Sequence, residues 1–423
     1  MNEADASHLL LPGALDPGER IRARLEKDYR TVGDQGSIDL PRLAFSEYGV
    51  DLAARLGSLE ISHPFGKGSG QLSLQAEQVA ADVRAGLAFT VLKTVIAESP
   101  GGASRMSAWK VPVSRMVTEE IVSRSGRKGW TVSWVGRGWD RGLDEYASFL
   151  SASLRAAVGS GLRVVPSAKF HLPGAPDEPY DTAEYEHTLA VLSRAWREGG
   201  GEGPLVLEKD FSPTLAGSEL ARERERIVAW IDAVPELVRR HAPLGVLLGL
   251  KLMNAVGPDA MQTEMLHRAA AVDPPLDFVT CFNRLFDPDR EIDGRRGIAY
   301  GGHDLSDRNL RALGLFAMEG GRASLSATGN ISSGRLMAEY ALRGATSGQI
   351  HTFFQLPRSA YVSRLPRSRA ALHELILHPG EGLIAAMAHV RRRVLGSPEE
   401  SIIRFLDLPE VGRRLLRGGE DVA

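Results

Sequence analysis

Short apolar segments recur along the chain and alternate with longer amphipathic ones. Each apolar segment is nearly continuous and rich in Val, Leu, Ile or Thr, which is typical of parallel strands buried on both faces. The eight segments, in chain order, are EISHPFGKGSG, FTVLKTV, LRVVPSAK, PLVLEKD, GVLLGLK, DFVTCFN, ASLSATGN and GQIHTFF. The pattern therefore predicts eight strands.

Helical periodicity fills the intervals between these strands. The clearest examples are QLSLQAEQVAADVRAG, LDEYASFLSASLRAAVGSG, ELARERERIVAWIDAVPELVRRH and SDRNLRALGLFAMEGG. Alternating strands and helices imply right-handed β-α-β units, and eight of them close into a (β/α)8 TIM barrel. A doubly wound open sheet is the alternative. It requires a glycine-rich turn near residue 70, where GKGSG is a weak match because no acidic residue ends the next strand.

The barrel is expected over residues 55–357, with an N-terminal extension over 1–54 and a C-terminal helical extension over 358–423. Two stretches interrupt the alternation. Residues 97–142 are too long for a plain connection after the second strand and carry Trp130, Trp134 and Trp139. We expect a covering insertion here, or a hairpin that only packs on the barrel. Residues 284–302 are polar and turn-rich and are expected to form a second covering loop.

Composition excludes several classes of protein. Hydrophobic residues are 43% and charged residues 25%, which excludes wholesale disorder. With 51 basic and 53 acidic residues, the net charge of −2 gives no electrostatic basis for binding nucleic acid or an anionic membrane. The single cysteine, Cys281, excludes an internal disulfide and a cysteine-based metal centre, and we expect it in the core. We expect a cytoplasmic enzyme of small molecules without a metal, a membrane-spanning segment or a targeting segment.

Polar residues gather at the predicted strand ends, which a barrel brings to one mouth. They are Lys93, Lys169, Glu208, Lys209, Lys251, Asn283, Thr328 and Thr352. A single lysine at a strand end is more often a solvated rim residue. Several lysines around one mouth repel one another unless an anion lies between them, so the sequence favours a phosphate, a carboxylate or an electron-rich flavin as ligand.

A phosphate site is predicted after the last two strands. TGNISSG leads into the helix RLMAEYALRG after the seventh strand, and HTF follows the eighth. Small residues let backbone N–H groups approach a phosphate, and the helix N-terminus adds a favourable dipole. The alternative is an ordinary serine N-cap beside a glycine turn.

These segments resemble the dihydroorotate dehydrogenase-like FMN flavoproteins over about residues 55–357. TGNISSGRLMAEYALRGATSGQIHTFF resembles the family's FMN-phosphate signature. HPFGKGSG, VLKTV, SPT, LLGLKL, FN and AYGGHDLSD resemble further family motifs in the same order. The resemblance implies FMN as cofactor, and a homodimer is expected from it alone.

Site roles follow from that resemblance. Ser69, Gly70, Lys93, Thr94 and Lys251 would contact the flavin, with Lys251 at its N1/O2 edge. The phosphate would be held by Gly302, Gly329, Asn330, His351 and Thr352. Asn283 would bind substrate, and Lys93 would reach both substrate and flavin. Ser212 falls where the family carries its active-site base.

The implied reaction oxidises or reduces a C–C bond next to a carbonyl, with proton removal on one face and the flavin on the other. Serine is a weak base alone, so Lys209 or Asp210 is expected to assist Ser212, unless Lys209 only forms an ion pair with Glu208. His303 is a weaker candidate for a proton donor.

The family's orotate-binding asparagines are replaced here by Ser133, Lys209 and Thr214. A site that has lost its amides binds an amide ring poorly, so we expect a substrate other than dihydroorotate. Lys209, Ser133 and Trp134 are its expected contacts, with Trp139 nearby.

Two other functions fit the same residues. One is a flavin-free phosphate-binding lyase or isomerase that uses a strand-end lysine. The other is a non-catalytic flavin-binding protein. Neither iron–sulfur ligands nor an NAD-binding domain is recognisable in the sequence, so a flavoenzyme would pass electrons to a soluble acceptor, oxygen, a quinone or a partner. The arginine-rich C-terminal helices are read as a solvated face or a subunit contact rather than a membrane anchor.

Overall fold

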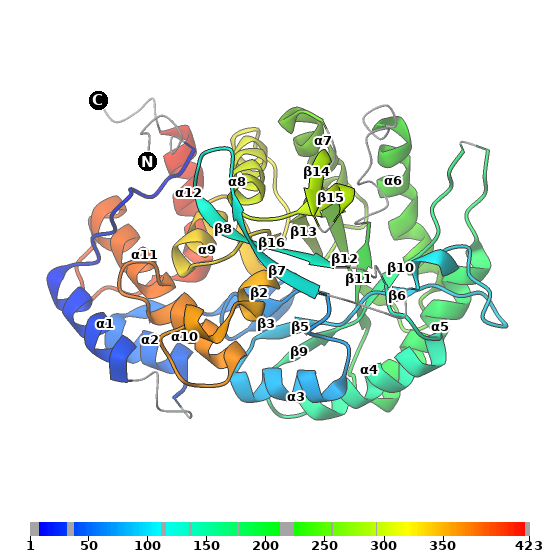
Figure 1. The fold of residues 1–423 in the computed structure, drawn as a ribbon, viewed down its shortest axis with the longest axis horizontal. Helices are drawn as coiled ribbons and strands as arrows, with labels where there is room; N and C mark the ends of the chain where they lie inside the picture. Colours follow the sequence, from blue (N-terminus) through cyan, green and yellow to red (C-terminus); the bar gives the residue numbers. More distant parts are fainter. Residues whose placement is uncertain are drawn as a thin grey trace.

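A computed structural model describes residues 8–31, 38–110, 116–134, 138–175, 177–211, 224–254, 257–292 and 294–418. A parallel sheet of short strands lies at its centre (Figure 1). These strands are β4 (Phe65–Lys67), β5 (Phe89–Val91), β6 (Val95–Ile96), β9 (Arg163–Val165), β10 (Ser167–Lys169), β11 (Leu205–Asp210), β12 (Val246–Met253), β13 (Phe278–Asn283), β16 (Leu325–Thr328) and β17 (Ala345–Ile350).

The sheet closes on itself. β5 and β6 are successive parts of one barrel strand, and so are β9 and β10. β4 pairs with β5, β5 with β9, and β6 with β10. From β10 the order continues through β11, β12, β13, β16 and β17, which pairs back to β4. Eight parallel barrel strands in chain order confirm the predicted TIM barrel.

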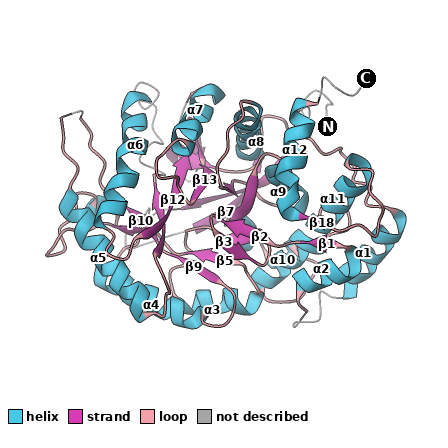
Figure 2. Cartoon of the chain, turned by 180° about the vertical axis from the view of Figure 1, so that it is seen from behind, coloured by secondary structure: helices cyan, strands magenta, loops and turns pink. Residues whose placement is uncertain are grey.

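An outer ring of helices covers the sheet (Figure 2). Each helix packs on the next along the chain. The ring helices are α3 (Ala76–Ala85), α4 (Leu143–Ala157), α5 (Thr182–Glu198), α6 (Arg224–His241), α7 (Asp259–Ala270), α8 (His303–Met318) and α9 (Gly334–Ala341). α10 (Arg367–Leu377) contacts both α9 and α3 and completes the ring. A barrel that ended at residue 357, as predicted, would leave out α10, the helix that follows and covers the eighth strand.

The two ends of the chain form one layer beside the barrel (Figure 1). It contains α1 (Glu19–Thr31), α2 (Leu40–Tyr48), α11 (Leu383–His389) and α12 (Leu408–Arg417). β1 (Val50–Asp51) and β18 (Ile403–Arg404) pair in parallel within this layer. The buried Arg391 guanidinium donates to the main-chain oxygens of Tyr48 and Ser401, at 3.0 and 2.8 Å, and so joins the two ends.

Three antiparallel hairpins complete the described part of the architecture. β2 (Ala54–Leu56) and β3 (Leu59–Ile61) precede the first barrel strand. β7 (Met116–Val122) and β8 (Lys128–Trp134) form a hairpin after the second barrel strand, within residues 97–142. β14 (Leu285–Ile292) and β15 (Arg295–Tyr300) follow the sixth, and β15 contacts β8. Two hairpins therefore lie beside each other at the C-terminal ends of the strands.

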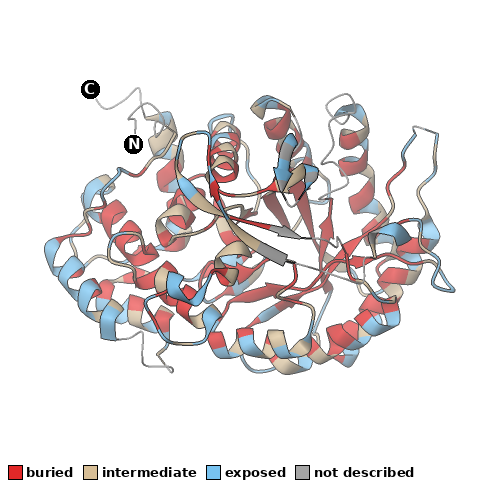
Figure 3. Cartoon of the chain, viewed as in Figure 1, coloured by how far each residue is buried: buried red, intermediate tan, exposed pale blue. Residues whose placement is uncertain are grey.

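Burial follows the expected pattern (Figure 3). Every residue of β4, β5, β10 and β11 is buried, as is Cys281. Within the described ranges, none of the helices combines the length and apolar character needed to cross a bilayer.

Candidate active site

The C-terminal ends of the barrel strands carry the polar residues that the sequence singled out. Lys169, Asn283 and Thr328 are the last residues of β10, β13 and β16. Lys93 and Thr94 occupy the interval between β5 and β6 and are 97% buried. Lys251 lies two residues before the end of β12. The closed barrel brings these residues to one rim.

A buried carboxylate lies inside the barrel beneath this rim. Glu208 has no exposed surface and lies 3.9 Å from the ammonium of Lys251. Its Oε2 accepts hydrogen bonds from Thr280 Oγ1, at 2.9 Å, and from Gln349 Nε2. Burial raises the pKa of Glu208, while the positive charge of Lys251 opposes that rise. Through these contacts Glu208 links the fourth, fifth, sixth and eighth barrel strands, which are β11, β12, β13 and β17.

A second carboxylate, Asp210, organises the first four strands. Its Oδ2 accepts from Thr94 Oγ1 at 3.1 Å and lies 4.0 Å from Lys169 Nζ. Thr94 Oγ1 is also 3.0 Å from the hydroxyls of both Ser69 and Ser167. Since Thr94 donates its one proton to Asp210, the two serine hydroxyls donate to Thr94. This chain of hydroxyls fixes Ser69 at the first strand end.

Cations outnumber anions in this interior. Lys93, Lys169 and Lys251 face Glu208 and Asp210, so with all five groups ionised the sum is 3 − 2 = +1. Burial lowers the pKa of Lys93 to about 8, Asp210 opposes the fall, and Lys251 adds to it. An anion placed here would relieve the repulsion between Lys93 and Lys251.

The His351 ring lies at the end of the eighth strand. Burial and the charges of Lys93, Arg284, Lys251 and Lys67 hold its pKa well below the usual range, so the ring is neutral. Its Nδ1 accepts a 2.7 Å hydrogen bond from Gln355 Nε2.

Gly70 leaves room for that ring. A Cβ at position 70 would lie 2.0 Å from His351 Nε2, so only glycine allows the turn after the first strand to approach the ring. The structure thus brings Gly70 and His351 together, with Thr352 beginning the 3-10 turn Thr352–Gln355.

The turn after the seventh strand has a backbone that few residues adopt. Gly329 has φ 109° and Asn330 has φ 54°, the left-handed region that Asn tolerates better than most residues. A Cβ at Gly329 would lie 2.6 Å from Asn309 Nδ2, which donates to Thr328 O at 2.8 Å.

Ser333 begins the helix that follows this turn. Its Oγ accepts from Leu336 N at 3.1 Å, so it is an ordinary N-cap. Because β16 and β17 are paired with Thr328 opposite Gln349, Gly329 and Thr352 follow the ends of adjacent strands. The serine N-cap and the glycine turn, which together formed the alternative to a phosphate site, are both present.

His303 connects this turn to the covering hairpin. Its Nε2 donates to Lys128 O at 3.1 Å, and its Nδ1 accepts from Asn330 Nδ2 at 3.3 Å. Burial and the neighbouring Arg127 lower its pKa. Both ring nitrogens are occupied, so the geometry favours a structural role over the proton-donor role considered from the sequence. Gly302 caps α8, with φ 80°, and a Cβ there would lie 2.8 Å from Ile121.

The covering hairpin is held on the N-terminal end of α8. Thr131 Oγ1 accepts from Gly301 N at 2.9 Å, Asp304 Oδ1 accepts from Arg124 N at 2.9 Å, and Arg127 pairs with Asp307. Ser133 and Trp134 end β8, but their side chains lie outside the described part of the structure. Ser212 and Thr214 also lie outside the described residues. The predicted base therefore has no observed geometry.

Two predicted neighbours of the substrate lie elsewhere. Lys209 alternates with Glu208 and Asp210 along β11, so its side chain leaves the opposite face of the strand. It is fully buried, donates to Asp210 O at 3.1 Å and lies over the Phe211 ring. Glu208 pairs with Lys251, which corrects the suggested pairing of Glu208 with Lys209.

Trp139 does not line the mouth. It is fully buried and stacks on Phe149 at 5.2 Å, with Tyr146 edge-on. The expectation that it lies near the substrate was wrong, because its ring fills the space between the barrel and α4.

No protein-family model and no curated protein matches this chain. Among solved structures, the chain is similar to DHODH from Eimeria tenella, solved in complex with ferulenol. The match has a TM-score of 0.54 and 14% identity, and covers 90% of this chain and 99% of that one. The shared fold is that of a dihydroorotate dehydrogenase.

Sequence reasoning missed the interior roles of Glu208, Thr280 and Gln349, and the position of Arg284 at the mouth. Burial lowers the pKa of Arg284 to about 10, and its charge acts on His351. A signal for Glu208 was present, since a carboxylate inside the apolar segment PLVLEKD is costly unless paired. Gln349 offered a weaker signal as an amide in a buried strand.

Proposed function

We propose that the chain is an FMN-dependent oxidoreductase that oxidises or reduces a C–C bond next to a carbonyl in a small molecule other than dihydroorotate. One observation carries the proposal. Three buried ammoniums face two carboxylates at the C-terminal end of a closed barrel. Two turns that exclude a Cβ adjoin them, at Gly70 and Gly329.

The residues present fit FMN. The turn at Gly329 and Asn330 and the backbone at His351 and Thr352 would supply N–H groups and a helix N-terminus for its phosphate. Ser69, Gly70 and Thr94 would line the ribityl chain and ring. When bound, FMN supplies hydride transfer at the substrate carbon.

The lysines provide the electrostatics. Lys251 is held by Glu208, so its ammonium stays in place to stabilise negative charge at one edge of the flavin. Lys93, beside Asp210, would act at the substrate. Asn283 would hydrogen-bond the substrate carbonyl. Ser212 follows Phe211, whose N–H donates to Lys251 O at 3.1 Å, and would take the substrate proton.

Acidic residues distinguish this interior from a site built for an amide ring. At the end of β11, the side chain that points into the barrel is that of Asp210 rather than that of Lys209. The loss of amides that the sequence shows, together with this carboxylate, supports a substrate other than dihydroorotate.

The test is the cofactor itself. Protein purified without added flavin should be yellow, and mass spectrometry of the released chromophore should identify FMN. Lys251→Met should weaken FMN binding at least tenfold, whereas Lys27→Met, an exposed lysine on α1, should leave it unchanged. A colourless protein that binds no added FMN while showing a native circular dichroism spectrum would overturn the proposal.

A second candidate rests on the pKa of Lys93, which burial lowers to about 8. An amine that is partly neutral near pH 7 is a nucleophile toward carbonyl compounds, as a flavin-free lyase requires. Borohydride reduction in the presence of substrate should then add mass to the peptide containing Lys93. Flavin-dependent turnover without such an adduct would exclude this candidate.

A further inference from the structure

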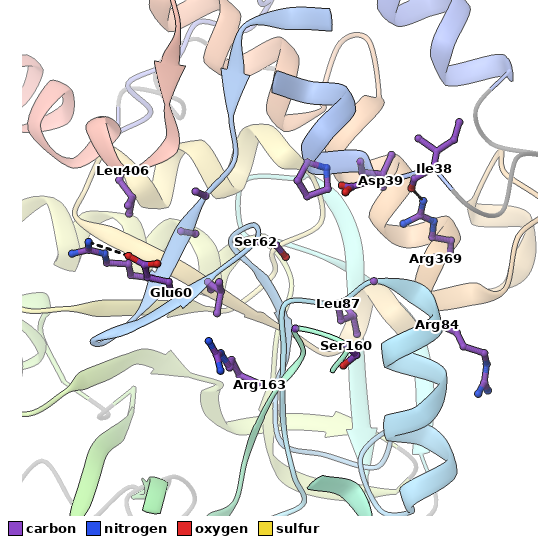
Figure 4. A pocket seen from close by; sticks show the side chains of 18 residues that line it. Ile38, Asp39, Glu60, Ser62, Arg84, Leu87, Ser160, Arg163, Arg369 and Leu406 are labelled. Carbon is purple, nitrogen blue, oxygen red and sulfur yellow. Dashed lines mark hydrogen bonds and ion pairs between the residues drawn. The ribbon is translucent and has the colours of Figure 1, made fainter. Parts of the chain in front are cut away.

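A cavity of about 760 Å³ lies at the opposite end of the barrel from the candidate active site (Figure 4). Its lining comes from the start of α2, the β2–β3 hairpin, the end of α3, the turn before β9, and α10. These segments meet where the barrel strands begin, so nothing placed here would touch the mouth. The volume falls within the range of small-molecule sites, roughly 300–1,000 Å³.

Apolar side chains form part of the wall. Leu40, Ala54, Ile61 and Leu87 line the cavity; they belong to the core behind it, so each presents only a small apolar edge to the cavity. Such a surface binds the apolar body of a ligand by removing it from water.

Guanidinium groups border the same cavity. Figure 4 shows Ser62, Leu87 and Ser160 between Arg163 and Arg369. Arg369 is fixed by donation to the main-chain oxygens of Ala85, at 3.3 Å, and Ile38. Burial lowers its pKa, and the nearby Asp39 opposes that fall. A cation fixed in this way meets a ligand at little entropic cost.

The acidic residues of the lining are already engaged. Glu60 lies 3.8 Å from Arg55, and the Asp39 side chain caps α2 by accepting from Arg42 N at 3.1 Å. Arg163 makes no side-chain hydrogen bond or ion pair with any residue in the described ranges, and Arg369 bonds only main-chain oxygens there. Positive charge is therefore concentrated at this cavity although the whole chain carries −2.

We propose that this cavity binds an organic anion. Its apolar body would lie against Leu40, Ile61 and Leu87, and its carboxylate, sulfonate or phosphate group would pair with Arg163 and Arg369. The site is separate from the proposed flavin site and does not depend on it. Arginine suits this role because its fork binds planar anionic groups bidentately.

The probe is 8-anilino-1-naphthalenesulfonate, an aromatic body with one sulfonate, titrated by fluorescence into the protein as purified. Its uncharged analogue, N-phenyl-1-naphthylamine, reports the apolar contribution alone. Arg163→Gln should weaken binding of the sulfonate about tenfold and leave the analogue unchanged. Ser62→Trp, which fills the exposed centre of the cavity, should weaken both.

Arg197→Gln, an exposed arginine on α5 that does not line the cavity, is the matched control and should change neither affinity. Circular dichroism melting of each variant shows that the fold is intact. Equal sulfonate binding by the wild type, Arg163→Gln and Ser62→Trp would overturn the proposal, as would absence of binding to the wild type.

Discussion

At the scale of single residues, the strand alternation in β11 decides which side chains enter the barrel. Glu208 and Asp210 enter it and are held by Thr280 and Thr94, while Lys209 is buried on the other face. A shift of one residue in the register of β11 would place Lys209 inside the barrel in place of Glu208 and Asp210. The chemistry of the mouth is therefore set by the register of one short strand.

Lys93 makes the stability of the cofactor-free protein depend on pH. Its folded-state pKa is about 8, below the value of about 10.4 for a free lysine, so the unfolded chain holds more protons between these values. Stability should therefore increase as pH rises through this window.

Lys93→Met removes this dependence. The variant's stability relative to wild type should fall by about 2.5 kcal/mol between pH 8 and pH 10.5, because only the wild type gains. Urea unfolding at both pH values measures it. Burial also lowers the pKa of Lys209, to about 7, but Lys209 is present in both proteins, so its contribution cancels in the difference between them. A difference between the two proteins that does not vary with pH would show that Lys93 ionises normally.

The residue scale also shows the limit of sequence reasoning. The lysines were identified because charge at the end of an apolar strand is conspicuous. The partners of Glu208 could not be identified from the sequence. Thr280 and Gln349 lie 72 and 141 residues away along the chain and meet Glu208 only when the barrel closes. The side-chain direction of Lys209 requires a register that periodicity leaves uncertain by one residue.

At the scale of elements, each predicted strand is present, but two are broken. β5 and β6 are interrupted at Leu92–Thr94, and β9 and β10 at Pro166. Proline cannot donate to a ladder, which accounts for the second interruption. The sequence predicted these two strands as continuous because their apolar pattern is continuous. The gap after β5 is what brings Lys93 and Thr94 to the mouth.

The packing of α12 depends on one glycine. A Cβ at Gly412 would lie 1.6 Å from Leu342 O at the end of α9, a contact that only displacement of the helix relieves. Gly412→Ala should destabilise the protein by about 1–3 kcal/mol, measured by urea unfolding. It should also make α12 sensitive to limited proteolysis.

Gly13→Ala is the control for this substitution, because a Cβ there would have nothing within 4 Å. We expect its unfolding free energy to match that of the wild type. If the free energy of unfolding of Gly412→Ala also matched the wild type, α12 would not be held against Leu342 in solution.

At the scale of the whole molecule, the chain ends are part of the barrel's support. α10 completes the helical ring, and β1 pairs with β18. The pattern of strands and helices predicted a barrel with terminal extensions, but not that the extensions pair with each other. A two-residue strand leaves too little pattern to recognise, and the π-helical turn Val390–Val394 that carries Arg391 has no sequence signature.

Arg391→Met should therefore destabilise the whole protein. It removes hydrogen bonds to Tyr48 O and Ser401 O and leaves these oxygens without that donor. The expected loss is about 2–4 kcal/mol in thermal or urea unfolding. Arg404→Met, an exposed arginine on β18, should change stability by less than about 0.5 kcal/mol. Equal effects of the two variants would contradict the role assigned to Arg391.

The first described residues of the chain bind the helix that follows the Gly329 turn. The N–H groups of Leu10 and Leu11 donate to the carboxylate of Glu339, which also pairs with Arg343, and these contacts span 329 and 328 residues. During synthesis, the segment can therefore meet its partner only after Glu339 has been translated, 328 residues beyond Leu11. A bulky group fused immediately before this segment would hinder that late docking.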